Sequence, residues 1–170
     1  MKRIILIGLL LLNVLASSAQ IQRKFLGFTL GSTSKTAVYN YLKTNHIKFI
    51  KNEEGEYCAE KVKFAGEIWE YVWFSFYNGK LYNVDFSISE YSKPIESMDL
   101  IYKRLDNSLS RKYAIYYDYN ESTSERKVYR DNTIQISFLY RYFQGSKSLS
   151  IMYTYLPILN SIVSSEDDEL

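Results

Sequence analysis

Apolar side chains recur along this chain of 170 residues in two different spacings. Over residues 35–45 they lie three and four positions apart, which predicts an amphipathic helix, and Ser32, Thr33 and Ser34 can cap its first turn. After this helix apolar residues alternate with polar ones, as is typical of antiparallel strands. The predicted strands are a short piece at 47–50 and longer ones at 57–64, 67–77 and 81–89.

The same succession starts again after residue 91. Pro94 suits the first turn of a helix, and a long apolar stripe follows from Ile95 to Leu109. The strands predicted after it cover residues 113–119, 126–130, 133–143 and 149–155. Pro157 is expected to end the ordered structure, with residues 158–170 as an acidic C-terminal tail.

The order of elements predicts an α+β fold of two tandem units, residues 20–90 and 91–157. Each unit is expected to be one helix packed on an antiparallel sheet of about four strands. Because no linker separates the units, two sheets should lie side by side in one compact body.

The aromatic content, 16% of all residues, is the most informative feature of the composition. Asn78-Gly79 predicts a tight hairpin turn, since both residues tolerate positive φ. An ideal turn would place Tyr77 opposite Lys80 and Trp73 opposite Val84. One face of the hairpin would then carry the candidate partner-binding residues Trp69, Tyr71, Trp73, Tyr77 and Tyr82. Tyr140, Tyr142, Tyr153 and Tyr155 of the second unit could extend this face.

Two interpretations of these rings remain open. Tyr and Trp bury a large area and keep a polar end, which suits a recognition surface. The same rings could instead pack the helices and the join between the units.

The first 19 residues have the order of a secretory signal peptide. Lys2 and Arg3 precede an apolar run, and small residues up to Ala19 follow it. The run is too short to span a membrane, so cleavage before Gln20 is expected, with a soluble product that is periplasmic or extracellular and has no membrane span. Removing Lys2 and Arg3 leaves 19 of the 21 basic residues against 19 acidic ones, and such a neutral chain is not expected to bind nucleic acid.

Few residues suit catalysis or metal binding. His46 is the only histidine and falls at the end of the first predicted helix, while Cys58 is the only cysteine and fits a small buried residue. Carboxylate pairs such as Glu67 with Glu70, or Asp85 with Asp118, are interpreted as solvated surface charge. The sequence therefore predicts no catalytic residue, no metal site and no cofactor.

Short motifs resemble a known family. They are Leu30-Gly31-Ser32-Thr33-Ser34-Lys35 with Val38 and Leu42, Phe25-Leu26-Gly27-Phe28, and Phe64-Ala65-Gly66 with Trp69. Together with the element order they resemble the fold of beta-lactamase inhibitor protein and of small outer-membrane-assembly lipoproteins, and a set of uncharacterised exported bacterial proteins. The resemblance implies a non-catalytic sheet face that grips a partner protein. Cys58 alone cannot form the inhibitor's disulfides and no lipid-accepting cysteine follows Ala19, so inhibition of beta-lactamase and lipidation are not implied.

The expected function is an exported, non-catalytic binding module that recognises a protein or peptide through its aromatic sheet face. One alternative is a carbohydrate-binding module, in which the same rings stack on sugars. Another is a hydrolase that uses His46 or a carboxylate pair.

Overall fold

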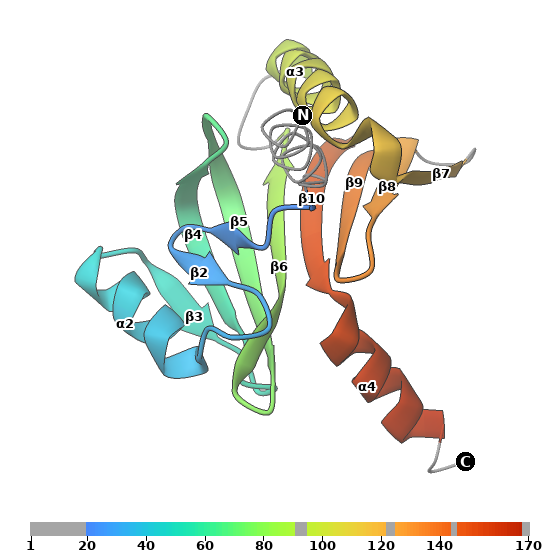
Figure 1. The fold of residues 1–170 in the computed structure, drawn as a ribbon. Coiled ribbons are helices and arrows are strands. Elements are labelled where there is room, and N and C mark those ends of the chain that lie inside the picture. The colour runs from blue at the N-terminus through green and yellow to red at the C-terminus, as the bar shows by residue number, and fades with distance from the viewer. Residues whose placement is uncertain (1–19, 91–94, 122–124, 144–145, 168–170) are drawn as a thin grey trace, which may run out of the picture.

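The computed structural model describes residues 20–90, 95–121, 125–143 and 146–167, and it has an α+β fold (Figure 1). Within these residues there are three α-helices, one antiparallel sheet of eight strands and one small sheet of two strands. The expected signal peptide and the residues predicted to open the second helix, 92–94, lie outside the described residues.

The elements lie in two series along the chain, before and after residue 91. The first consists of β1 (Lys24–Phe25), β2 (Phe28–Thr29), α2 (Lys35–Thr44), β3 (Phe49–Lys51), β4 (Tyr57–Phe64), β5 (Glu67–Tyr77) and β6 (Lys80–Ser89). The second consists of α3 (Ile95–Tyr113), a 3-10 turn η1 (Ala114–Tyr116), β7 (Tyr117–Glu121), β8 (Glu125–Arg130), β9 (Ile134–Phe143), β10 (Ser146–Tyr155) and α4 (Leu156–Asp167). Strands were expected at nearly all of these positions, but residues 113–116 complete α3 and form η1 rather than beginning a strand.

The large sheet is continuous, in the order β3-β4-β5-β6-β10-β9-β8-β7. Its two halves meet where β6 pairs with β10, for example Phe86 with Ile151. The expectation of two sheets lying side by side is therefore wrong, because the eight strands form one sheet. An unpaired edge leaves a row of backbone donors and acceptors without partners, and the pairing of β6 with β10 removes two such edges.

One face of the large sheet is covered by helices and by the β1–β2 hairpin (Figure 1). The hairpin places Phe28 against Phe74 of β5, with ring centroids 5.8 Å apart, while α3 stacks Tyr102 on Phe138 of β9 at 5.3 Å. Val38 of α2 is fully buried. The main core lies between these elements and the sheet, and we call this side of the sheet the covered face.

Helix α2 begins where the sequence predicts, because Ser34 caps it. The Ser34 hydroxyl accepts a hydrogen bond from the backbone N–H of Ala37 at 3.2 Å. We expect Ser34→Ala to lower the free energy of unfolding by about 1 kcal/mol, the usual effect of losing such a cap. Denaturant titration would measure it, with Ser32→Ala as the control, since Ser32 donates only to the nearby Thr29 carbonyl. An equal loss in both variants would contradict a capping role for Ser34.

The chain does not lose order at Pro157. Residues 156–167 form α4, which leaves the end of β10 and projects from the body of the protein (Figure 1). Proline is tolerated in the first turn of a helix because the N–H it lacks has no intrahelical partner there. The prediction of a tail from residue 158 is therefore wrong for residues 158–167.

Candidate functional site

A β-bulge in the β5–β6 hairpin determines which residues share a face. Asn78 and Gly79 have φ of +48° and +70°, and Tyr77 pairs with Lys80, which confirms the predicted turn. The register then shifts by one residue, because Ser75 pairs with Asn83 and Tyr82 is the extra residue. As a result Trp73 lies opposite Asp85, and the expected pairing of Trp73 with Val84 is wrong.

Trp69 lies in the core because the alternation of β5 is interrupted between Trp69 and Val72, which are both buried. On the paired strand β4, Lys61 lies between the partners of Tyr71 and Trp69 and has φ of +55°. The ring centroid of Trp69 is 5.6 Å from that of Phe86, on the covered face. Trp69 is fully buried, and its indole N–H donates to the Phe64 carbonyl at 3.0 Å. The expectation that Trp69 shares a recognition face with Tyr71 and Trp73 is therefore wrong.

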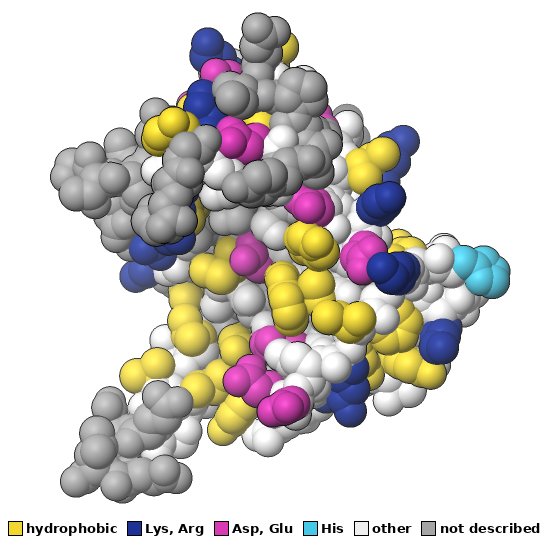
Figure 2. All heavy atoms as spheres, turned by 180° about the vertical axis from the view of Figure 1, so that it is seen from behind, with side chains coloured by type: hydrophobic (Ala, Val, Ile, Leu, Met, Phe, Trp, Pro, Cys, Tyr) yellow, Lys and Arg dark blue, Asp and Glu magenta, His cyan; other side chains and the backbone are white. Residues whose placement is uncertain are grey.

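The opposite side of the sheet forms the candidate site, and we call it the open face. Its central row runs across β4, β5, β6, β10, β9 and β8 as Cys58, Trp73, Asp85, Met152, Ser137 and Val128. The next row consists of Glu60, Tyr71, Ser87, Ser150, Leu139 and Arg126. Figure 2, which views the molecule from this side, shows apolar and acidic side chains near the centre and basic ones mostly towards the margin.

The aromatic residues named from the sequence are spread over several places. Tyr71 is 42% exposed and Trp73 is half-buried, both on the open face. Tyr77 and Tyr82 are half-buried near the hairpin end and at the bulge. Burial raises the pKa of Tyr82.

The tyrosines of the second half do not extend the open face. Tyr153 pairs with Val84 and Tyr140 with Leu149, and all of these residues point to the covered side of the sheet. Tyr155 packs against the core there, and Tyr142, 71% exposed, follows Tyr140 by two positions. The expectation that these residues join Trp73 in one surface is wrong, because alternation along β9 and β10 sends them to the other side.

Asp85 has the most unusual environment on the open face. Its Oδ1 atom is shielded from solvent, and no group among the described residues donates a hydrogen bond to it. Burial raises the pKa of Asp85 from 3.8 to about 6. Asp85 is therefore not the solvated charge expected from the sequence. It is also far from Asp118, because three strands lie between β6 and β7.

Other acidic groups on or near this face already have partners. Glu60 forms an ion pair with Lys48 at 2.8 Å, and this pairing raises the pKa of Lys48. Glu70 accepts hydrogen bonds from the backbone N–H and the hydroxyl of Ser89. In contrast to these two carboxylates, Asp85 has an Oδ1 atom with no hydrogen-bond donor among the described residues.

Cys58 and His46 lie outside any visible catalytic arrangement. Cys58 is a buried free thiol, as expected, and burial raises its pKa. A raised pKa reduces the thiolate fraction and therefore the reactivity of the sulfur. His46 is exposed just beyond the end of α2, with φ of +52°.

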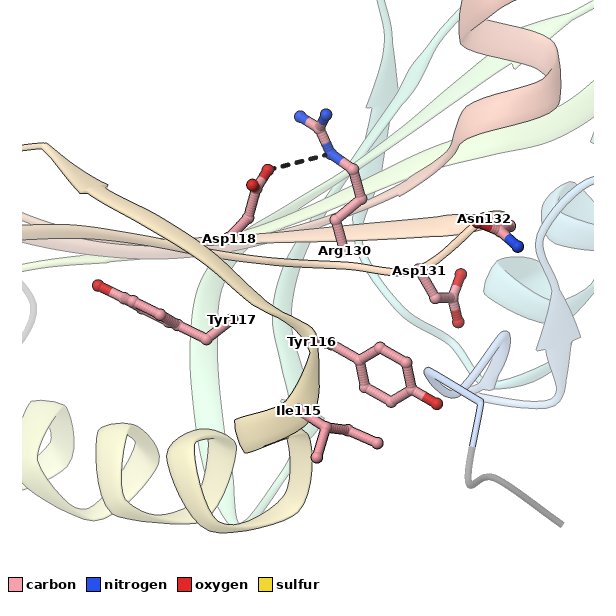
Figure 3. A pocket seen from close by; sticks show the side chains of 7 residues that line it. All are labelled: Ile115, Tyr116, Tyr117, Asp118, Arg130, Asp131 and Asn132. Atoms are coloured by element: carbon pink, nitrogen blue, oxygen red, sulfur yellow. Dashed lines mark ion pairs between the residues drawn. The ribbon is translucent and has the colours of Figure 1, made fainter. Parts of the chain in front are cut away.

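A hollow of about 260 Å³ lies near the edge of the sheet, lined by Ile115, Tyr116, Tyr117, Asp118, Arg130, Asp131 and Asn132 (Figure 3). Its charged side chains interact with other groups of the chain. Arg130 pairs with Asp118 at 3.5 Å, and this pair points away from Tyr116 and Asp131. Asp131 accepts the backbone N–H groups of Ile21, Thr133 and Ile134. Burial alone would raise the pKa of Asp131, but these hydrogen bonds hold it below its usual value. The hydrogen bond from Ile21 to Asp131 thus joins the segment before β1 to the turn between β8 and β9.

Neither metal binding nor membrane insertion finds support in the described segments. No group of three or more His, Cys, Asp or Glu side chains there is arranged to hold a metal ion. None of the described helices has the length and apolarity needed to cross a bilayer.

Comparisons with models of protein families, with curated proteins and with solved structures found no match. The function is therefore inferred from the residues of this chain. Of the sites described above, the open face is the one that has both an exposed aromatic ring, that of Tyr71, and a carboxylate oxygen with no hydrogen-bond donor among the described residues.

Proposed function

We propose that the protein is an exported, non-catalytic binding module that recognises a protein or peptide through the open face. The observation that carries the proposal is the placement of Tyr71 and Trp73 on the side of the sheet opposite α2, α3 and the β1–β2 hairpin. Exposed aromatic and apolar residues that gather on one surface usually mark an interaction site. Ile50, 58% exposed, and Ile68, 55% exposed, lie on strands of the same half.

The dimensions of the open face favour a macromolecular partner over a single sugar. Eight strands about 4.8 Å apart span roughly 34 Å. A stable protein complex buries about 800 Å² on each partner, which a surface of this width can supply. The face combines Tyr71, Trp73 and Met152 with short polar residues such as Ser87 and Ser150, and Tyr, Trp and Met are enriched at protein interfaces.

We further propose that the two halves of the sheet are copies of one unit, as in the beta-lactamase inhibitor protein-like fold that the motifs resemble. Each half contains a helix, α2 or α3, that precedes four consecutive antiparallel strands of the large sheet. This arrangement supports the binding of a partner protein, because the pairing of β6 with β10, the last strands of the two halves, doubles the width of the open face.

Export is proposed on the order of charges and apolar residues in the first 19 positions. The position of Ile21 agrees with cleavage before Gln20. Ile21 is 1% exposed and packs in the core, whereas Gln20 is exposed.

Trp73→Ala tests the proposed function. Peptides selected on the wild-type protein from a displayed random library should lose most of their binding to this variant, because a central aromatic anchor commonly contributes a factor of about 30 or more in affinity. Tyr142→Ala is the matched control, since Tyr142 is an exposed ring of the same sheet that lies outside the open face. Its binding should equal that of the wild type.

Two results would contradict the proposal. One is a set of selected peptides that binds Trp73→Ala and the wild type equally well. The other is an absence of peptide binding together with glycan binding that needs Trp73, which would favour the carbohydrate alternative. Thermal unfolding of each variant would establish that the fold is retained.

A further inference from the structure

We propose that Asp85 and Trp73 together receive a cationic side chain, lysine or arginine, of the bound partner. This inference rests on the proposed function and specifies the chemistry of the partner. Two independent observations support it: a shielded carboxylate oxygen without a hydrogen-bond donor, and an aromatic ring directly opposite it in the strand register.

The register brings the two side chains together on the open face. Asp85 on β6 pairs with Trp73 on β5 and with Met152 on β10. Side chains directly opposite in an antiparallel pair have Cβ atoms about 5 Å apart. An indole ring is the best aromatic acceptor for a cation, and a neighbouring carboxylate supplies the opposite charge. A cationic group above this pair would lie against the ring and close to the charge of the carboxylate.

No cation of the described chain occupies this position. Lys48 is paired with Glu60, and Arg130 contacts Asp118 and Gln135. No described lysine or arginine lies over the Trp73 ring, whereas Arg23 lies over Tyr155, on the covered side of the sheet. The carboxylate is ionised at neutral pH, because burial raises its pKa only to about 6.

Desolvation favours a charged ligand at this point. A partly buried carboxylate without a partner is energetically unfavourable, because it has lost part of its hydration free energy. A cation placed beside it replaces much of that lost stabilisation by electrostatic attraction. A neutral or acidic group would leave Asp85 uncompensated or repel it. The open face should therefore select partners with a basic residue at the centre of the contact.

The two tryptophans allow a direct test, because one lies in the core and the other on the open face. The indole N–H signals of Trp69 and Trp73 would be followed by NMR during titration with N-acetyl-arginine amide. N-acetyl-citrulline amide, nearly the same in shape but neutral, is the control ligand. We expect the arginine compound to shift the Trp73 signal saturably, the Trp69 signal to stay in place, and the citrulline compound to bind about tenfold more weakly.

Asp85→Asn is the matched variant, since it removes the charge and keeps the size of the side chain. It should bind the arginine compound about tenfold more weakly than the wild type, with an unchanged Trp69 signal as evidence of an intact core. Equal binding of the two compounds, or equal binding by Asp85→Asn and the wild type, would overturn the inference. Selected peptides that need Trp73 but show no preference for basic residues would overturn this inference alone and leave the proposed function standing.

Discussion

Trp69→Ala is expected to lower the free energy of unfolding by about 3 to 5 kcal/mol, the usual range for truncating a fully buried large aromatic side chain. Trp69 is completely inaccessible to solvent and packs against Phe86 on the covered face. Its removal would leave a cavity, and the Phe64 carbonyl would lose its indole donor. A domain of ordinary stability would keep only a small margin after such a loss.

Urea titration followed by circular dichroism would measure this effect. Trp73→Ala is the matched control, because it removes the same side chain from the opposite side of the sheet, where the ring is only half-buried. We expect the control to lose clearly less stability. Equal losses in the two variants would mean that Trp73 is also part of a core, and the open face would lose its main aromatic residue.

Asp85→Asn is expected to raise the free energy of unfolding at neutral pH by about 1 to 3 kcal/mol. The pKa of Asp85 is about 6 in the folded protein against 3.8 as its ordinary value. Folding therefore favours the protonated carboxyl and opposes the ionised one, and a shift of one pKa unit corresponds to about 1.4 kcal/mol. Asparagine is uncharged at every pH and avoids this penalty.

The pH dependence follows from the same shift. Below about pH 4 Asp85 is protonated in both the folded and the unfolded protein, so the two proteins should differ little. Between about pH 4 and 6 only the unfolded chain is ionised, and the wild type loses stability relative to Asp85→Asn as pH rises. Above pH 6 the difference is constant.

Urea titrations of both proteins at pH 4, 5, 6 and 7.5 would test this profile. The residues directly opposite Asp85, Trp73 and Met152, do not titrate, so the difference between the two proteins reports on Asp85 itself. A difference that does not change with pH, or a variant less stable than the wild type at pH 7.5, would contradict a buried, unpartnered carboxylate.

Much of the local structure was predictable from the sequence. Strands β4 and β5 lie at the predicted residues, because strand-forming residues fill both segments and clear breaks bound them. The Asn78-Gly79 turn has the positive φ angles that these residue types favour. Ser34 caps α2 because its hydroxyl can reach a free N–H of the first turn. Each of these features depends on a few neighbouring residues.

The faces of the strands were not predictable, because two irregularities without a local signal determine them. Lysine is not a residue that favours positive φ, yet Lys61 adopts it within β4. The bulge at Tyr82 likewise has no glycine at the extra residue itself. The bulge places Asp85 beside Trp73, and the interruption of β5 opposite Lys61 places Trp69 in the core.

Asp85 could have been noticed from one feature of the sequence. It lies between Val84 and Phe86 in a predicted strand, so its carboxylate must lie on one face of the sheet beside residues of the neighbouring strands. Which neighbours these are depends on the pairing of β6 with β10, and no local pattern determines that contact between distant segments.

The pairing of β6 with β10 also bears on how the chain folds and unfolds. Thr154 donates a hydrogen bond to Asn83, a residue 71 positions earlier, so this junction closes only after most of the chain has been synthesised. Ile88 and Leu149 are both buried on the covered side of the junction, and a fragment ending before β10 would expose a strand edge that invites self-association. We therefore expect the two halves to unfold in one transition rather than separately.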